Sequence, residues 1–589
     1  MSIFDNTCDF ELSLTDIQAI DELEKRFTQR DSPLLDIPYS SELCDDTEDI
    51  LPRNRNRKRC YVIDSDDEDE YTGQQVSSVN TRIDKDFWRE PTGKQRKVIP
   101  FTECPGLKPY SLRSLMVHSK PEDFYALLVP DSMFHNIAIE TNRYAAQTIT
   151  NLSSKKQIKP GSRLHSWTDT NQDEMKRFFG LILFMGIVRL PKLADYWSID
   201  QMICQTFPRK IMPRNRFEIL LRMVHFCNNN NQRCGDRLFK IRDLIDTLNL
   251  NFKAHYYPQE NLCIDESLVP FRGRIMFRQY IKLKRHKYGI KVFKLCTNSG
   301  YTNKIQIYAG KRCETENTTP TNVVMSLMEG YLQKGHTLYT DNWYTSVNLG
   351  RKLLENETHR VGTLRKNRKY LPKVVINGKI RKGEFRAKEN EDGITCMKWK
   401  DKRDVYLLST KHSIGFTRTY KRDKEIIKPK IVKDYNSAKS AVDLSDQMIA
   451  YSTPLRKTVK SYRKLAVELL LNTALLNSYI IYKETTKSKI GIVDYRKKLC
   501  KYLTDSGKEN YNPETSLAIN KRQKHELKKK EGPVKKSRKY CSRCYKVNVR
   551  TLGRNYARKK TKQVNTYCPQ CPNELHFCLN CFNEEHKKL

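Results

Sequence analysis

The sequence contains little apolar material and no apolar run long enough to cross a bilayer. Hydrophobic residues make up 38% of the 589 residues, and charged residues make up 30%. The longest uninterrupted apolar run, FFGLILFMGIV at 178–188, has eleven residues, whereas spanning ~30 Å of hydrocarbon needs about 20. The longer stretch 465–482 contains Glu468, Asn472 and Asn477. It therefore predicts a buried helix, and we expect no membrane partner.

Signals for secretion are also lacking. The first residues, MSIFDNTCDFELSLTD, have neither the cationic nor the apolar region of a signal peptide. Twelve of the 18 cysteines are scattered singly over the first 500 residues, as free thiols are in a reducing compartment. The other six lie between residues 541 and 581.

Acidic residues are scarce outside the N-terminal segment. Residues 1–70 contain 20 acidic and 8 basic residues, a net charge of −12, so the +40 of the whole chain leaves +52 for the rest. This excess predicts a polyanionic partner, with nucleic acid before an anionic membrane surface. The clustered charge of 1–70 is typical of a disordered tail. The run RNRNRKR at 53–59 resembles a nuclear localisation signal, although such short runs also occur by chance.

The apolar spacing predicts a multidomain chain with a mixed α/β sheet. A single core stops growing near ~250–300 residues. The spacing is mostly helical up to residue 259, and short β-branched runs such as LCID and YGIKVFKLCT follow. Strands and helices then alternate through HTLYTD and HRVGTLR, which favours an α/β fold. A basic segment with strand-like pieces interrupts this pattern, and helical spacing returns at Lys439.

Three aspartates stand where carboxylates can meet. Asp265 ends the run LCID, Asp341 ends HTLYTD, and Asp443 begins a helix with Asp446 one turn later. Phosphodiester transfer by two metal ions needs a few converging carboxylates, and Mg²⁺ prefers oxygen ligands. The alternative is that each aspartate serves as a turn former or a helix cap.

The C-terminal cysteines have the spacing of structural zinc sites. Two C-x₂-C pairs are followed by further cysteines and histidines, which is enough for two tetrahedral Zn²⁺ ions. The eight candidate ligands are Cys541, Cys544, Cys568, Cys571, His576, Cys578, Cys581 and His586. Of His576 and Cys578, only one is expected to bind zinc. PHD and RING modules share such spacings, so a histone-tail or ubiquitin role is the alternative.

Long motifs resemble the piggyBac family of DNA transposases. IDESLVPFRGR, FRQYIKLKRHKYGIKVF, YTDNWYTS, VGTLRKNR and VDLSDQM occur in that family's order and spacing. FFGLILFMGIVRLPKLADYWS and RFEILLRMVHF resemble its helical region, and the resemblance covers about residues 108–589. One departure is Ser440-Ala441, where family members often carry a glycine pair.

The resemblance implies a fold class and a domain plan. We expect a multidomain α/β protein with an RNase H-like catalytic domain, a β-rich insertion, a helical dimerisation and DNA-binding domain, and a cross-brace zinc domain. The expected boundaries are a disordered acidic tail at 1–104, the helical domain at 105–260 and 455–520, the catalytic domain at 261–367 and 433–454, the insertion at 368–432, a basic linker at 521–539, and the cysteine-rich domain at 540–589.

The resemblance also implies an activity. Asp265, Asp341 and Asp443 are expected to hold two Mg²⁺ ions, which Mn²⁺ can replace, with Asp446 as a supporting carboxylate. The expected reaction is cut-and-paste transposition: a nick at the transposon end, a hairpin, reopening, and integration at TTAA. We expect double-stranded DNA as partner, a homodimer, and a nuclear location.

Basic residues near these aspartates are candidate DNA contacts. The stretch 272–294 has nine Lys/Arg and no acid, with aromatic residues between them. The candidates are Arg272, Arg274, Lys287, Lys291, Arg365 and Arg368. A solvated strand pair is the alternative. For the whole chain, the alternatives are a domesticated piggyBac-derived DNA-binding protein without transposition activity and a zinc-finger chromatin adaptor.

Overall fold

The computed structural model of the protein describes residues 87–115, 119–159, 161–231, 235–282, 284, 286–310, 319–421, 424–507, 526–533, 537–569, 571 and 574–586. The predicted tail at 1–70 and its basic run at 53–59 lie outside the described residues, as does most of the predicted basic linker.

A mixed sheet forms the centre of the described chain. Nine strands join in the order β4-β5-β3-β7-β8-β11-β10-β9, with β6 also paired to β5. β3 is parallel to β7, and β7 is parallel to β8, while every other neighbouring pair is antiparallel. The strands are β3 (Asn261–Pro270), β4 (Gln279–Tyr280), β5 (Tyr288–Thr297), β6 (Thr302–Ile307), β7 (Thr337–Thr340), β8 (His359–Thr363), β9 (Phe385–Glu389), β10 (Thr395–Lys400) and β11 (Asp404–Ser409). The predicted mixed α/β sheet is confirmed.

Strand alternation explains why helices cover both faces of the sheet. Leu262 and Ile264 of β3 pack with α9 (Pro320–Met328) and α10 (Val347–Glu355) on one face. Cys263, which lies between them, packs on the other face with α12 (Lys430–Ala438) and α13 (Ala441–Ala450). Successive strand side chains point to opposite faces, so an almost continuous apolar run is needed when both faces are covered.

Three of the five strands in the segment 368–432 join the central sheet. Its strands β9, β10 and β11 extend the central sheet beyond β8, through Leu407↔Thr363 and the next two register pairs. Cys396 and Leu408 join a core that also includes Val347 of α10. The short helix α11 (Lys373–Asn377) and the two-stranded hairpin of β12 (Phe416–Lys421) and β13 (Lys424–Pro429) complete this segment.

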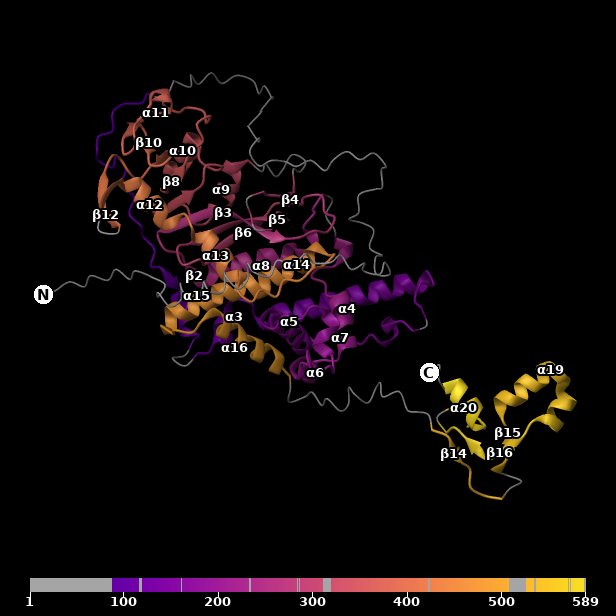
Figure 1. The fold of residues 1–589 in the computed structure, drawn as a ribbon. Helices are drawn as coiled ribbons and strands as arrows, with labels where there is room; N and C mark the ends of the chain where they lie inside the picture. The colour runs from indigo at the N-terminus through magenta and orange to yellow at the C-terminus, as the bar shows by residue number, and fades with distance from the viewer. Residues whose placement is uncertain are drawn as a thin grey trace, which may run out of the picture. The chain divides into compact units, whose positions relative to one another are not determined.

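Helices from two distant parts of the sequence form one helical region. The earlier part has α2 (Pro109–Arg113), α3 (Pro121–Leu128), α4 (Asp131–Ser154), α5 (Gln172–Ile187), α6 (Thr206–Ile211), α7 (Arg214–Met223) and α8 (Phe239–His255). The later part has α14 (Ser461–Glu468), a π-helical turn (Leu469–Thr473), α15 (Ala474–Thr486) and α16 (Ile492–Asp505). In Figure 1, α15 lies beside α3 and α14 beside α8, and α16 packs on α5.

The long apolar helix of this region is buried. The segment Ser461–Thr486 is long and apolar enough to cross a membrane by length and composition, but 89% of its apolar window is buried inside the protein. Asn477 donates its amide to Thr302 O at 2.8 Å and accepts from Thr302 N at 2.8 Å. The buried amide of Asn477 thus has its partner in the sheet, and the predicted buried helix is confirmed.

The prediction of disorder up to residue 104 is wrong for residues 87–104. This segment packs on the sheet domain, because it carries the apolar anchors Trp88 and Ile99. Arg89 exchanges two backbone hydrogen bonds with Glu389, and Arg96 pairs with the same glutamate at 2.7 Å. The overall composition of the segment did not indicate order, because these few apolar residues lie among many charged ones.

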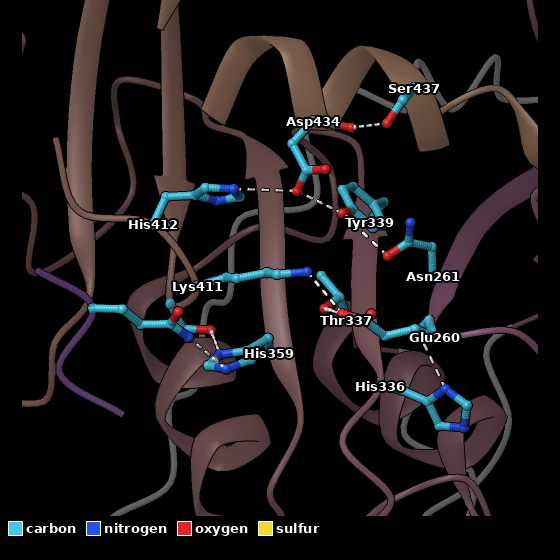
Figure 2. Close-up of polar contacts among 12 residues, drawn as sticks. Glu260, Asn261, His336, Thr337, Tyr339, His359, Lys411, His412, Asp434 and Ser437 are labelled. Carbon is cyan, nitrogen blue, oxygen red and sulfur yellow. Dashed lines mark hydrogen bonds and ion pairs between the residues drawn. The ribbon is translucent and has the colours of Figure 1, made fainter. Parts of the chain in front are cut away.

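The amino ends of the three parallel strands carry a network of paired polar side chains (Figure 2). Lys411 Nζ lies 2.8 Å from Glu260 Oε1, and His412 Nε2 lies 3.3 Å from Asp434 Oδ2. Tyr339 donates its hydroxyl to the same Asp434 oxygen at 2.7 Å. Opposite charges therefore face each other at this end of the strands.

The C-terminal module contains short elements around cysteines. They are β14 (Lys528–Lys529), β15 (Lys539–Tyr540), α19 (Ser542–Lys560), β16 (Gln563–Val564), β17 (Thr566–Tyr567) and α20 (Leu579–His586). Its small core is made of Cys541, Cys568 and Phe577 with partly buried neighbours that include four more cysteines. So little apolar material suits a module that folds with a metal.

Candidate functional site

Strand register brings Asp265 and Asp341 together. The parallel pairing of β3 and β7 ends at Ile264↔Thr340. Asp265 and Asp341 are the next residues on these neighbouring strands, which lie ~4.8 Å apart. Asp265 and Asp341 lie two residues after Cys263 and Tyr339, so they point to the same face of the sheet as these residues. The side chains of Cys263 and Tyr339 pack toward α12 and α13. The two carboxylates therefore converge on one face of the sheet.

Helix α13 brings two further aspartates to the same face. Asp443 lies in the first turn of α13, with its side chain 66% exposed. Asp446 lies one turn later, and its Oδ1 accepts hydrogen bonds from Ser267 Oγ at 2.7 Å and Lys294 Nζ at 2.9 Å. Because Ser267 is two residues beyond Asp265 on β3, these contacts place the helix start beside the aspartates of the sheet.

The electrostatics of this cluster disfavour charge. Burial raises the pKa of Asp265 well above its usual value, and the neighbouring Glu266 and Asp341 carboxylates raise it further. Burial and the charge of Glu266 also raise the pKa of Asp341 to about 6, against the hydrogen bond that Trp343 N donates to Asp341 Oδ1 at 2.9 Å. Such crowded carboxylates are typical of functional sites. Their all-oxygen donor set fits a hard divalent cation such as Mg²⁺.

Sequence reasoning missed two charged neighbours of these aspartates. Glu266 is the carboxylate that acts most strongly on Asp341, and Tyr344 donates its hydroxyl to Glu266 Oε2 at 3.4 Å. Lys284 Nζ lies 3.0 Å from Glu266 O and 3.8 Å from Asp443 Oδ1. Glu266 directly follows Asp265 in IDESLVPFRGR, and nothing in the sequence singled it out as a second acidic neighbour. Lys284 was one of nine basic residues in 272–294 with no signal to single it out.

The candidate DNA contacts lie in different environments. Arg272, Arg274 and Lys287 are exposed. Lys291 is buried, with its ammonium 4.7 Å from the ring centre of Trp343 and 4.9 Å from that of Phe293. Because Lys291 is buried against these two rings, it supports the aromatic pair and does not lie at the surface, where it could contact a phosphate.

The two arginines after β8 lie beside the turn that follows Asp341. Arg365 Nε donates to Asn342 Oδ1 at 3.2 Å, and Arg368 donates to the backbone oxygens of Asn342 and Trp343. The Arg365 charge also acts against the rise in the pKa of Asp341. These arginines support the candidate site from one side.

Four of the eight candidate zinc ligands meet in the structure. The Sγ atoms of Cys541, Cys544, Cys578 and Cys581 all lie within 4.8 Å of one another. Cys544 Sγ is 3.4 Å from Cys581 Sγ and 4.0 Å from Cys578 Sγ. Thiolates around a tetrahedral Zn²⁺, with Zn–S of ~2.3 Å, are ~3.8 Å apart. The donor set and its spacing thus fit zinc.

The other four candidates are not in this cluster. Cys568 and Cys571 lie in the sequence between the pair Cys541 and Cys544 and the pair Cys578 and Cys581, which meet in the cluster. His576 is buried, with its ring tilted against Tyr567 at 5.8 Å. His586 ends α20, and its side chain lies outside the described residues. Between His576 and Cys578, the structure brings Cys578 to the four-thiol cluster.

Comparisons with known proteins match most of this chain. The family model described as Transposase IS4 matches residues 120–479. PiggyBac transposable element-derived protein 3 of Homo sapiens is 26% identical over 355 residues, which cover 57% of this chain and 59% of the relative. PiggyBac transposable element-derived protein 2 of Homo sapiens is 25% identical over 379 residues, which cover 60% of each chain. The matches thus span about three fifths of these human relatives.

A solved structure matches a larger part of the fold. A cryo-EM structure of the piggyBac transposase synaptic complex with hairpin DNA has a TM-score of 0.60 and 25% sequence identity to this chain. The match covers 82% of this chain and 100% of that one. Similarity therefore extends over sheet and helices together.

Proposed function

Because this chain belongs to the piggyBac group of the Transposase IS4 family, we propose that it is a cut-and-paste DNA transposase. It binds the terminal inverted repeats of a transposon, excises the element through hairpin intermediates, and integrates it at TTAA. The observation that carries this proposal is the β3–β7 register, which brings Asp265 and Asp341 together, with the start of α13, which carries Asp443, bonded to β3 through Asp446.

The topology supports an RNase H-like catalytic domain. The strands β6, β5, β3, β7 and β8 are adjacent in that order, with an antiparallel β6-β5-β3 meander followed by the parallel β7 and β8. Asp265 within β3 and Asp341 directly after β7 are held in position by the sheet. The fold thus supplies the fixed geometry that phosphodiester transfer requires.

Asp265, Asp341 and Asp443 would hold the divalent metal, Mg²⁺ or Mn²⁺. When bound, the ions activate the attacking oxygen and stabilise the leaving oxygen. The chain's own part is to present the carboxylates, with Asp341 oriented by the Trp343 amide. Lys284 lies beside Asp443 and Glu266 and supplies positive charge near an incoming phosphate.

The proposal extends to DNA and assembly. Exposed Arg272, Arg274 and Lys287 would contact phosphates near the cleaved bond, since they follow the strand that carries Asp265. Two transposon ends must be processed together, so we propose a homodimer that acts on double-stranded DNA. Its place of action is the nucleus, in keeping with the run RNRNRKR.

We also propose two structural Zn²⁺ ions in the C-terminal module. Cys541, Cys544, Cys578 and Cys581 would hold one, and a second site would draw on Cys568, Cys571 and His586. Purified protein should contain about two zinc ions per chain by mass spectrometry. Cys544→Ser should remove one ion and leave the melting of the central domain unchanged. A metal-free wild type would contradict this assignment.

A plasmid excision assay tests the proposed reaction. The donor carries a marker between the inverted repeats that flank the native reading frame, and repair of the empty site is scored by sequencing. Wild type should restore TTAA at the empty site, while Asp265→Asn and Asp443→Asn should not. A wild type that binds these ends without cutting them would instead favour the domesticated DNA-binding protein.

A further inference from the structure

Lys294 is a buried charge at the centre of the molecule. It lies on β5, directly opposite Asp265 in the β3–β5 register, and is only 1% exposed. Lysine is almost never fully buried unless it is paired. A buried lysine beside the carboxylates is therefore expected to have a partner and a role.

That partner is Asp446. Lys294 Nζ lies 2.9 Å from Asp446 Oδ1, and the buried Ser267 donates its hydroxyl to the same oxygen at 2.7 Å. Two neighbouring strands, β5 and β3, thus bind one carboxylate oxygen of α13. Because Asp443 lies one turn before Asp446, these contacts set the position of Asp443 relative to β3.

The same lysine faces the helical region. Burial acts to lower the pKa of Lys294, but Asp446 and the buried Glu468 of α14 outweigh it and keep the ammonium charged. Asn472 donates to Glu468 Oε2 at 2.7 Å from within the π-helical turn Leu469–Thr473. Single π-helical turns inside helices often occur at functional sites. The ammonium of Lys294 is therefore bonded to α13 through Asp446 and stabilised by the charge of a carboxylate in the helical region.

We propose that Lys294 is a positioning residue that acts through Asp446, fixing α13 on strands β3 and β5 so that Asp443 stays with Asp265 and Asp341. Asp446 is then the anchor of the helix rather than a metal ligand. The inference rests on the proposed function, since positioning matters only if the carboxylates bind metal.

The test uses full-length wild type, Lys294→Met, Asp446→Asn and the double variant. Lys304→Met is the matched control, because Lys304 on β6 pairs with Glu329 at 3.0 Å, away from the four aspartates. Nicking of labelled transposon-end DNA is measured over a Mn²⁺ series. Lys294→Met should raise the half-saturating Mn²⁺ concentration and slow nicking by about 10- to 100-fold. The control should stay within about twofold of wild type.

Non-additivity separates positioning from a general packing effect. If Lys294 acts through Asp446, the double variant is no slower than Asp446→Asn alone. Unchanged Mn²⁺ dependence in Lys294→Met would overturn the proposal, and so would a double variant whose loss is the product of the single losses.

A second measurement needs no DNA cleavage. Mn²⁺-dependent stabilisation in a melting experiment reports metal binding directly, and the midpoint of the Mn²⁺ titration should shift about tenfold in Lys294→Met. If wild type binds Mn²⁺ but cuts no DNA end, the proposed function fails while this titration still decides the role of Lys294. If Lys294→Met does not fold, Ser267→Ala removes the other donor to Asp446 Oδ1 and should shift the midpoint the same way. No shift in Ser267→Ala would then count against the proposal.

Discussion

Carboxylates are crowded together at one end of the parallel strands β3, β7 and β8 and are paired with nitrogen groups at the other end. At the carboxyl end of their parallel pairing, just after Ile264 and Thr340, Asp265 and Asp341 crowd together with Glu266, and the pKa values of the two aspartates are raised. At the amino ends, each carboxylate faces a nitrogen group: Glu260 faces the Lys411 ammonium and Asp434 faces the His412 ring (Figure 2).

The comparison separates stability from function on a single sheet. Burial acts to raise the pKa of Asp434, but hydrogen bonds from His412 and Tyr339 outweigh it and hold the pKa below its usual value. The amino end is therefore built to stabilise the fold. At the carboxyl end, the crowded carboxylates repel one another. A bound cation would relieve this repulsion, which would favour its binding.

Replacing an aspartate at the carboxyl end should have the largest effect. Asp341→Asn removes a proposed metal ligand and should slow DNA nicking by at least about 10³-fold, or ~4 kcal/mol of transition-state stabilisation. The same change removes like-charge repulsion, so the free energy of unfolding without metal should stay equal or rise. Urea unfolding and single-turnover nicking measure the two quantities. A strongly destabilised variant would contradict the proposed division.

The corresponding change at the amino end should have the opposite profile. Asp434→Ala removes the partner of His412 and Tyr339 and should lower the free energy of unfolding by about 2 kcal/mol. Nicking per folded molecule should not change. Tyr339→Phe, which removes one hydroxyl donor and keeps the ring, should cost ~1 kcal/mol in the same urea experiment. Loss of nicking in a fully folded Asp434→Ala would break the comparison.

The pH dependence of the amino end gives an effect no larger than that of Asp434→Ala. Burial lowers the pKa of His359 to about 4, with Lys411 adding to the shift. Since the usual value is near 6.5, the unfolded chain binds more protons between pH 4 and 6.5, and stability rises with pH in that window. The rise from His359 should be about 2 kcal/mol, discounted for solvent screening. His359→Gln should flatten this part of the urea stability profile, and an unchanged slope would show that His359 is not its source.

The sequence foretold the alternation of strands and helices from 262 to 365 closely, because short β-branched runs and helical spacing are local signals. It also predicted correctly that Asp341 directly follows a strand, but Asp265, which was expected to end its strand, lies in the middle of β3, because β3 continues to Pro270 in its pairing with β5. It did not foretell that β9, β10 and β11 join the same sheet, because strand pairing across 30 or more residues leaves no local signal.

Charged residues that become buried were hardest to foresee. Lys291 and Lys294 looked like surface lysines, because their partners Trp343 and Asp446 are far away in sequence. Among the described cysteines, spacing indicated metal ligands, while which four thiols meet, with Cys578 and not His576 among them, needed coordinates. The sequence therefore did not predict residue roles that depend on contacts with distant residues, whereas it did predict roles that follow from residue spacing.

The contact between Gln95 and His359 provides the test with the smallest expected effect. Gln95, in the 87–104 segment, places its side-chain amide 3.0 Å from His359 Nε2. With Gln95 as donor, this ring nitrogen accepts and the ring is neutral. Gln95→Ala should cost about 1 kcal/mol and bring the His359 pKa back toward 6.5 by admitting water. Gln95→Glu should raise that pKa above the Gln95→Ala value, because a carboxylate facing the ring favours the imidazolium. NMR titration of the His359 ring measures both shifts. Equal pKa values in wild type and both variants would mean that the 87–104 segment does not control the charge of this strand end.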